Sequence, residues 1–379
     1  MCAIQRVHIE PEILAWTIAR RGLDVEEYCR KNKLFAAWIT GKIDPTFHQA
    51  ESFARSNYIP FGYLMLERPI DESLPIPFFR TRNGRTEDLN VKDQVKLLSE
   101  RQTWLSGYLA QNNMPALDYV GSISLNTPLE ESVERMHMLL GLEDGWTLAC
   151  HTVGEAIKRI VDHMEDLGCV VVFGSTVGFS STRSIEVANC RGLSLVDKYA
   201  PFIFVNGKDA QQAQLFTLTH EFTHVLLGFS AGHGDMESVV TNQQERLCDQ
   251  VAAGFLVPGL LFQNKWRETQ GNIERLSLQF KVSRFVIARR ALEFGLLTVS
   301  DFRRLLTVWE KEPIPEGRKK KSAVPFPIRA VRTNGRLFLV HLDNALNNHS
   351  ILYRDAYRLT GMKGDTYQKV IQSRYFIGV

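Results

Sequence analysis

The chain has 379 residues, more than one hydrophobic core usually organises, so two or three domains are predicted. Hydrophobic content of 44% and charged content of 23% exclude an extensively disordered chain, and the formal net charge of +3 gives no general signal for nucleic acid or membrane binding. Six scattered cysteines without a Cys-x-x-Cys spacing disfavour a cysteine zinc site and a disulfide framework, and no apolar run has the length of a secretory leader or a membrane helix. These features predict a cytoplasmic protein with no membrane contact.

Residues 1–68 are predicted to form a domain of short helices. Helices are expected at residues 11–21, 25–32, 34–40 and 45–55, with a further short helix before Pro69. Turn or cap residues stand at their ends. Their expected core consists of apolar positions at helical spacing: Ile13, Leu14, Ile18, Leu23, Tyr28, Trp38, Ile39, Phe53 and Leu64. With Trp38 followed by Gly41 and Pro45, the segment resembles the lambda-repressor-like (XRE) helix-turn-helix family.

Two functions are open for this first domain. The resemblance makes Lys33–Trp38 part of the helix that reads bases, but this stretch is poor in the Arg, Gln, Asn and Ser side chains that bond base edges. Residues 1–68 carry nine basic and eight acidic side chains, which gives a modest capacity for phosphate. DNA binding through residues 9–66 and docking of a protein partner are therefore about equal alternatives.

Residues 69–145 are predicted to be a linker and a helical connector. Pro69–Asp88 is rich in proline and charge, which is typical of a linker. The helical region that follows is interrupted near Pro115 and Pro128.

Residues 146–312 are predicted to form a second domain, in which a few strands lead into a long helix. A helix is expected at 151–167 and strands at 168–173, 187–190 and 202–205. His151 and His163 are expected to be surface residues, because both lie far along the chain from the motif described next.

The motif is the stretch Phe216–Gly228, which contains H-E-F-T-H at 220–224. In a helix, His220 and His224 lie one turn apart and present two imidazoles on one face, the arrangement that binds zinc. Glu221 is then expected beside the open side of the metal as the general base.

A catalytic zinc site needs a third protein ligand. The spacing that would supply a histidine fails, since Ser230 stands six residues past His224, and His233 is expected to be a solvated loop residue. Glu245 lies 21 residues past His224, a separation typical of enzymes whose third ligand is a glutamate on a second helix. Asp249, one turn beyond Glu245, is placed to accept a hydrogen bond from a zinc-bound imidazole.

Three runs resemble the ImmA/IrrE metallopeptidase family: F-T-L-x-H-E-x-x-H-x-L-L at 216–227, E-x-x-x-D-x-x-A-A-x-x-L-x-P at 245–258 and V-S-x-x-x-x-x-x-R-A-L at 282–292. The resemblance covers roughly residues 151–306 and implies a zinc-dependent endopeptidase that acts on a repressor. Asp249 stands where Asn is usual in the family, and Val251 where Phe is frequent. The fold class that follows is α+β and mainly helical: a five-helix domain, a zincin-like domain with a small sheet, and a short C-terminal α/β region.

Residues 313–379 are predicted to be a linker and a small C-terminal domain. A β-hairpin is expected over residues 329–342, because Asn334-Gly335 is a strong turn signal, and helices are expected at 353–359 and 365–373. No chemistry is predicted for this part.

The motif predicts a Zn²⁺-dependent endopeptidase, and the family resemblance implies that it cleaves or controls a transcriptional repressor or other partner protein in a prophage, stress-response or toxin–antitoxin system. Two alternatives stay open. One is an antitoxin that neutralises a toxin by binding, with a slow or vestigial peptidase site. The other is a DNA-binding repressor that uses the peptidase domain as a sensor.

Overall fold

The computed structural model describes residues 5–72, 78–79, 88–233, 243–312 and 324–373. These residues fall into two compact units. The first unit holds residues 5–72 with 88 and 89, and the second holds the others. No helix in these ranges is both long enough and apolar enough to cross a membrane.

The first unit is helical, as predicted. Its helices are α1 Pro11–Ala19, α2 Val25–Lys31, α3 Lys33–Ile39, α4 Phe47–Ser56 and the 3-10 helix η1 Phe61–Met65. Asp24 caps α2 by accepting a hydrogen bond from the amide of Glu27 at 2.7 Å, and Thr46 and Gln49 form a capping box at the start of α4. Asp24 thus caps the helix predicted after it, whereas α4 begins at Phe47, two residues after the predicted start at Pro45.

The core of the first unit differs from the prediction, most clearly at Leu23 and Phe35. Leu23 is 40% exposed in the turn between α1 and α2, so its predicted core role is wrong. Phe35 is instead fully buried, where it stacks on Phe53 and meets Trp38 edge-on. Helix α3 thus turns Phe35 and Trp38 inward and leaves Leu34 exposed.

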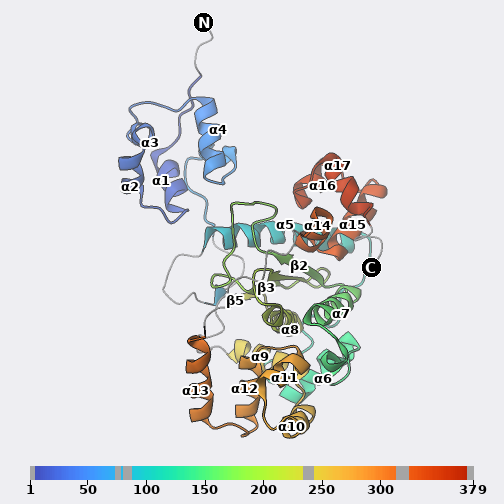
Figure 1. The fold of residues 1–379 in the computed structure, drawn as a ribbon. Coiled ribbons are helices and arrows are strands. Elements are labelled where there is room, and N and C mark those ends of the chain that lie inside the picture. Colours follow the sequence, from blue (N-terminus) through green and yellow to red (C-terminus); the bar gives the residue numbers. More distant parts are fainter. Residues whose placement is uncertain (1–4, 73–77, 80–87, 234–242, 313–323, 374–379) are drawn as a thin grey trace. The chain divides into compact units, whose positions relative to one another are not determined.

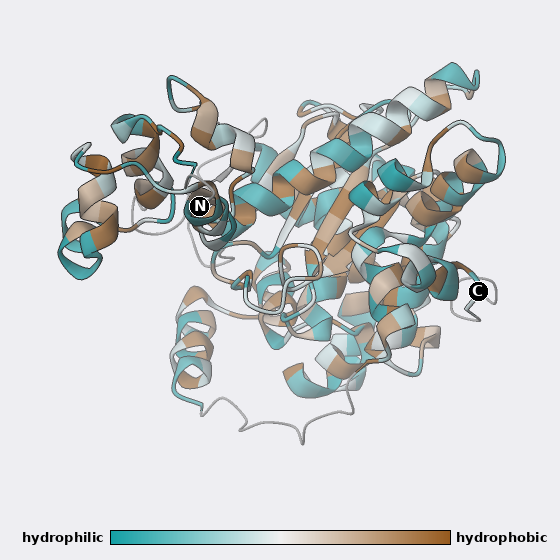
Figure 2. Cartoon of the chain, turned by 90° about the horizontal axis from the view of Figure 1, so that it is seen from above, coloured by the Kyte–Doolittle hydropathy of each residue, from teal (hydrophilic) through white to brown (hydrophobic). Residues whose placement is uncertain are grey.

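The second unit is built on a mixed sheet. Its described strands are β1 Phe78–Phe79, β2 Val170–Gly174, β3 Gly192–Leu195, β4 Phe202–Asn206 and β5 Ala231–His233. They lie in the order β1-β5-β3-β4-β2. The pairs β2–β4 and β1–β5 are parallel, while β3 is antiparallel to both β4 and β5. The central strands carry hydrophobic colours in Figure 2, and every residue of β3 and β4 is buried.

Two strand predictions are corrected. Val187–Cys190 is not a strand, because the amides of Asn189 and Cys190 both bond the carbonyl of Glu186 and close a turn. The ladder with β4 begins two residues later, at Gly192. The expected loop around His233 is likewise a strand, β5, paired with β3.

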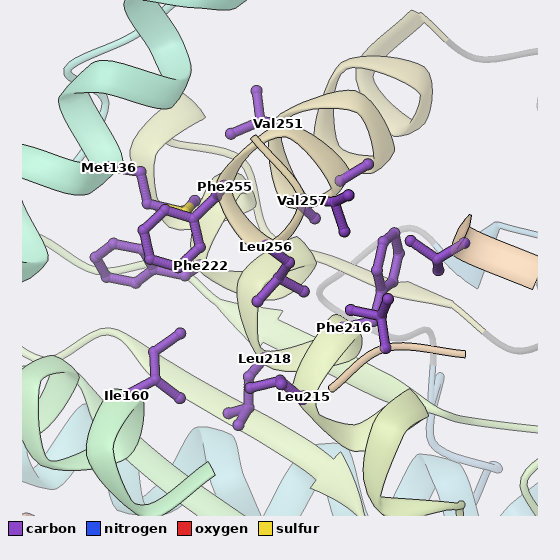
Figure 3. Packing of buried hydrophobic residues seen from close by; sticks show 14 of the residues in the cluster. Met136, Ile160, Leu215, Phe216, Leu218, Phe222, Val251, Phe255, Leu256 and Val257 are labelled. Carbon is purple, nitrogen blue, oxygen red and sulfur yellow. The ribbon is translucent and has the colours of Figure 1, made fainter. Parts of the chain in front are cut away.

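Helices cover both faces of this sheet (Figure 1). The described ones before the C-terminal part are α5 Leu89–Gln111, α6 Leu129–Leu140, η2 Trp146–Ala149, α7 Val153–Asp166, α8 Gln211–Leu227, α9 Gln243–Leu256, α10 Gly259–Glu268, α11 Ile273–Phe280, α12 Arg284–Glu293 and α13 Val299–Glu310. Helix α8 lies against β3 and β4 on one side and against α7 and α9 on the other. Figure 3 shows the resulting core, to which α6, α7, α8 and α9 contribute Met136, Ile160, Phe222 and Phe255.

The predicted hairpin near Asn334-Gly335 is wrong. The described part of the C-terminal region consists of helices: α14 Phe326–Asn334, α15 Arg336–Asn347, α16 Tyr353–Thr360 and α17 Gly364–Ile371. Gly335 has φ +84° and forms the corner between α14 and α15, where a Cβ would lie 2.6 Å from Val170 Cγ1. The Asn-Gly pair therefore marks a helix–helix corner against β2, and the expected α/β character of this region is corrected to helical.

A buried arginine ties these helices to the rest of the second unit. Arg101 of α5 is 1% exposed and donates hydrogen bonds to the carbonyls of Leu359 at 2.9 Å and Thr333 at 3.0 Å. Its guanidinium also lies 5.8 Å from the ring centroid of Phe338. Helices α14 to α16 are thus anchored to α5, and α14 and α15 also contact β2.

Candidate metal centre

Helix α8 places the motif in the interior. All its residues from Gln214 to Leu227 are buried, because sheet and helices enclose it. Two of its buried hydroxyls bond to carbonyls of the same helix: Thr219 to Phe216 at 2.8 Å and Thr223 to Thr219 at 2.9 Å. The helix ends at Gly228, which is left-handed at φ 78°.

Three side chains, from His220, His224 and Glu245, converge at this helix and are called the donor triangle below. His220 Nε2 lies 3.2 Å from His224 Nε2, and Glu245 brings Oε2 to 3.3 Å from His220 Nε2 and Oε1 to 3.2 Å from His224 Nε2. A tetrahedral zinc ion with bonds of about 2.0–2.1 Å holds its donor atoms roughly 3.3 Å apart. The donor spacing and donor chemistry therefore fit one zinc-sized cation.

Asp249 lies behind this triangle. Its Oδ1 is 3.0 Å from His220 Nδ1, which donates a proton to it when the imidazole is neutral and so directs the Nε2 lone pair toward the triangle. Burial alone would lower the pKa of His220, but Asp249 and Glu245 raise it well above its ordinary value. The centre thus favours positive charge between its carboxylates.

Glu221 is fully buried on the same helix, and a strand backbone runs close to its carboxylate. A Cβ on Gly192 of β3 would lie 2.8 Å from Glu221 Oε1 and 2.4 Å from Thr217 Cγ2. Only glycine fits there without a shift of β3 or α8. Sequence reasoning missed Gly192, because nothing in its local pattern shows which helix side chain it faces.

Cys248 is a second residue that sequence reasoning missed. Its sulfur and the nearest nitrogens of His220 and His224 all lie within 4.8 Å of one another, so a His-His-Cys donor set is present in addition to the His-His-Glu set. Burial, together with Glu245, Glu221 and Asp249, raises the pKa of the Cys248 thiol well above its ordinary value. The Glu245 oxygens lie 3.2–3.3 Å from the imidazole nitrogens, which is the donor spacing of a tetrahedral zinc ion, so the geometry favours Glu245 over Cys248 as the third donor. The three-residue spacing from Glu245 could have revealed Cys248, since both face the same side of a helix.

The other histidines named from the sequence lie elsewhere. The metal-donor cluster among the described residues contains neither His151, which is exposed, nor His163 of α7. His233 lies in β5, and its side chain is outside the described part of the structure.

The small residues after Glu245 bring α9 close to its neighbours. Ala252 and Ala253 are buried, and a Cβ on Gly254 would lie 2.7 Å from Val133 Cγ2 of α6. This packing fixes α9 and hence Glu245.

Comparison with known proteins agrees with this geometry. Residues 164–292 match the family model described as the IrrE N-terminal-like domain, Peptidase_M78. This match supports the resemblance to the ImmA/IrrE family over these residues, which include α8, α9 and the whole donor cluster. It supports a peptidase of metal-dependent type.

A second match lies in the C-terminal helices. Residues 334–373 match a family model described as a domain of unknown function, DUF8813. Neither match reaches the first unit, so its helix-turn-helix character stays a prediction. No curated protein matches the chain.

Proposed function

We propose that this protein is a zinc-dependent peptidase that acts on a partner protein, with zinc held by His220, His224 and Glu245. The observation that carries the proposal is the convergence of His220, His224 and the two carboxylate oxygens of Glu245, with separations of 3.2–3.3 Å, on a buried H-E-x-x-H helix. When bound there, zinc supplies Lewis acidity toward the scissile carbonyl and toward water. Asp249 orients His220 through its Nδ1 hydrogen.

Glu221 is the proton carrier in this proposal. It follows His220 directly on α8, and Gly192 leaves room for its carboxylate. A Glu221 carboxylate oxygen accepts a proton from the attacking water and then delivers it to the leaving amine of the cleaved peptide. Burial of the surrounding helix keeps bulk water from competing for that proton.

The partner class we propose is a transcriptional repressor or a toxin of a prophage, stress-response or toxin–antitoxin system. What supports it is the family match over residues 164–292 beside a separate five-helix unit. That unit is a candidate for partner docking, because α3 leaves Leu34 exposed. Binding without cleavage, as by an antitoxin, and DNA binding by the first unit are the alternative functions.

The first experiment compares zinc content in three purified variants of the full chain. Wild type is expected to hold about one zinc per chain. Glu221→Gln should keep the metal, because its carboxylate is outside the triangle, whereas Glu245→Gln should lose more than about 100-fold in zinc affinity, exceeding the loss expected for an outer residue. Cys248→Ala, three residues along the same helix, is the matched control and should keep its zinc. Zinc loss in Cys248→Ala with retention in Glu245→Gln would reverse the ligand assignment.

The second experiment tests cleavage of the protein encoded beside the gene. Wild type should cleave it, and Glu221→Gln should bind it without cleaving. If wild type and Glu221→Gln bind the partner equally and neither cleaves it, the result would support the antitoxin function. Footprinting that finds a specific operator for the first unit would favour a repressor.

A further inference from the structure

A cavity separate from the metal centre lies at the carboxyl ends of strands β2 and β4. Its volume is about 240 Å³, and none of the metal-centre residues lines it. Phe173 and Gly174 close it at the end of β2, and Gly207 closes it just after β4. Because β2 and β4 are parallel, their carboxyl ends share this edge, which is where open α/β sheets usually bind ligands.

Helix α14 forms the opposite wall and carries two arginines into it. The helix lies beside β2 (Figure 1), and Arg329 and Arg332 both line the cavity. Arg332 holds its guanidinium 4.6 Å from the ring centroid of Phe173, and Arg329 holds its own 5.4 Å from that of Phe326. Within the described ranges neither guanidinium makes an ion pair, and no acidic side chain lines the cavity. Two positive charges thus share one cavity without a counter-ion from this part of the protein.

The loop after β2 adds hydroxyl groups and a hydrophobic surface. Ser175 and Ser181 line the cavity, and in the part of the chain that the structure describes their hydroxyls make no hydrogen bond. Phe179 and Val324 provide apolar wall beside them. The cavity therefore has a cationic, hydroxyl-rich side and an aromatic side.

We propose that this cavity binds a small phosphate monoester whose organic part is apolar or aromatic, such as a nucleoside monophosphate. Guanidinium groups bind phosphate through paired, directional hydrogen bonds, and the serine hydroxyls supply further donors. A dianion with three acceptor oxygens matches two arginines better than a single carboxylate does. The cavity is larger than a phosphate group alone requires, and Phe173 and Phe179 offer surface for the organic part.

The ligand would connect two parts of the second unit. It would contact the sheet edge at β2 and β4 on one side and α14, the helix leading into the DUF8813 match, on the other. The sheet also supports α8, which carries the H-E-x-x-H motif. The proposal concerns binding and stands independently of the peptidase function.

The experiment measures ligand-dependent thermal stability of the full chain with a panel of nucleoside monophosphates and aryl phosphate monoesters. At least one should raise the unfolding temperature with saturation, because it binds only the folded protein. Arg332→Met and Arg329→Met should each raise the dissociation constant about tenfold or more. The methionine at position 332 keeps an aliphatic side chain over Phe173. Arg303→Met is the matched control, since Arg303 is an exposed arginine of α13 outside the cavity, and it should bind as wild type does.

Three probes separate the parts of the proposal. The uncharged nucleoside and inorganic phosphate should both bind at least about tenfold more weakly than the monoester, since each lacks half of the contacts. A carboxylate of similar size, such as benzoate, should also bind more weakly. The proposal is overturned if no panel member binds, if both arginine variants bind like wild type, or if any of these three probes binds as tightly as the best monoester. Each arginine variant is compared by its unfolding temperature without ligand, so a folding defect in one leaves the other as the test.

Discussion

Replacing Gly192 by alanine should disturb the metal centre through a steric clash, without changing any charge. The new methyl group would lie 2.4 Å from Thr217 Cγ2 and 2.8 Å from Glu221 Oε1, whereas unstrained carbon contacts begin at about 3.5 Å. The overlap with Thr217 therefore exceeds 1 Å. Neither side can give way cheaply, because β3 and this part of α8 are fully buried.

The expected cost is about 1–3 kcal/mol, the range for overpacked cores. The unfolding temperature should fall by about 2–4 °C for each kcal/mol. Cleavage should fall further than zinc content, since the displaced carboxylate is Glu221 and not a residue of the donor triangle.

A double variant tests whether the clash is the cause. Thr217→Ser removes Cγ2 and with it the shorter overlap, so Gly192→Ala combined with Thr217→Ser should recover part of the lost stability. Gly107→Ala, near the C-terminal end of α5, is the control. Its Cβ meets nothing within 4 Å, and the change should stabilise by about 0.5–1 kcal/mol. If Gly192→Ala melts like wild type, or if Thr217→Ser restores nothing, the packing argument fails.

Three further changes follow from the same contacts. Asp249→Ala should weaken zinc binding about 10–100-fold in competition with a chelator, and unchanged affinity would contradict its orienting role. Zinc affinity should fall on acidification, because Asp249 and Glu245 raise the pKa of His220 in the metal-free protein and the proton on its imidazole must leave before the metal binds; an affinity that does not change between about pH 8 and 6 would oppose this. Arg101→Met should cost about 2–4 kcal/mol and speed hydrogen exchange in α14 and α16, since the carbonyls of Leu359 and Thr333 lose their buried donor; protection equal to wild type would show that the anchor is dispensable.

The side chains of the candidate metal centre could be predicted to lie in two groups because each group follows helical periodicity. His220 and His224 are four residues apart, as are Glu245 and Asp249, so each pair shares a face once its helix forms. Sequence spacing does not show that the two helices meet. That contact depends on Ala252, Ala253 and Gly254, which are small enough to let α9 approach its neighbours.

The failures have a common physical origin in tertiary contacts. Asn334-Gly335 carries the strongest local hairpin signal in the chain, yet Gly335 serves there as a corner between two helices against Val170. Gly192 shows no local signal at all. Its role appears only when β3 is placed against α8, a contact between residues distant in sequence. From the sequence alone, Arg332 would be predicted to be an ordinary surface arginine. Its place at the cavity follows only from the packing of α14 against β2.

The charge in the metal centre argues independently for a bound cation. Glu221 is 0% exposed and Glu245 is 7% exposed, and the carboxylate of Asp249 lies 3.0 Å from His220. With neutral imidazoles, the buried carboxyl groups of Glu221 and Glu245 and the partly exposed one of Asp249 bring negative charge together, which is costly in an interior unless a cation compensates it. In the metal-free protein a proton on His220 supplies one positive charge, as its raised pKa indicates. A divalent ion in the donor triangle would supply two and would displace that proton. Metal and proton therefore compete for the same place, which is why zinc retention should depend on pH.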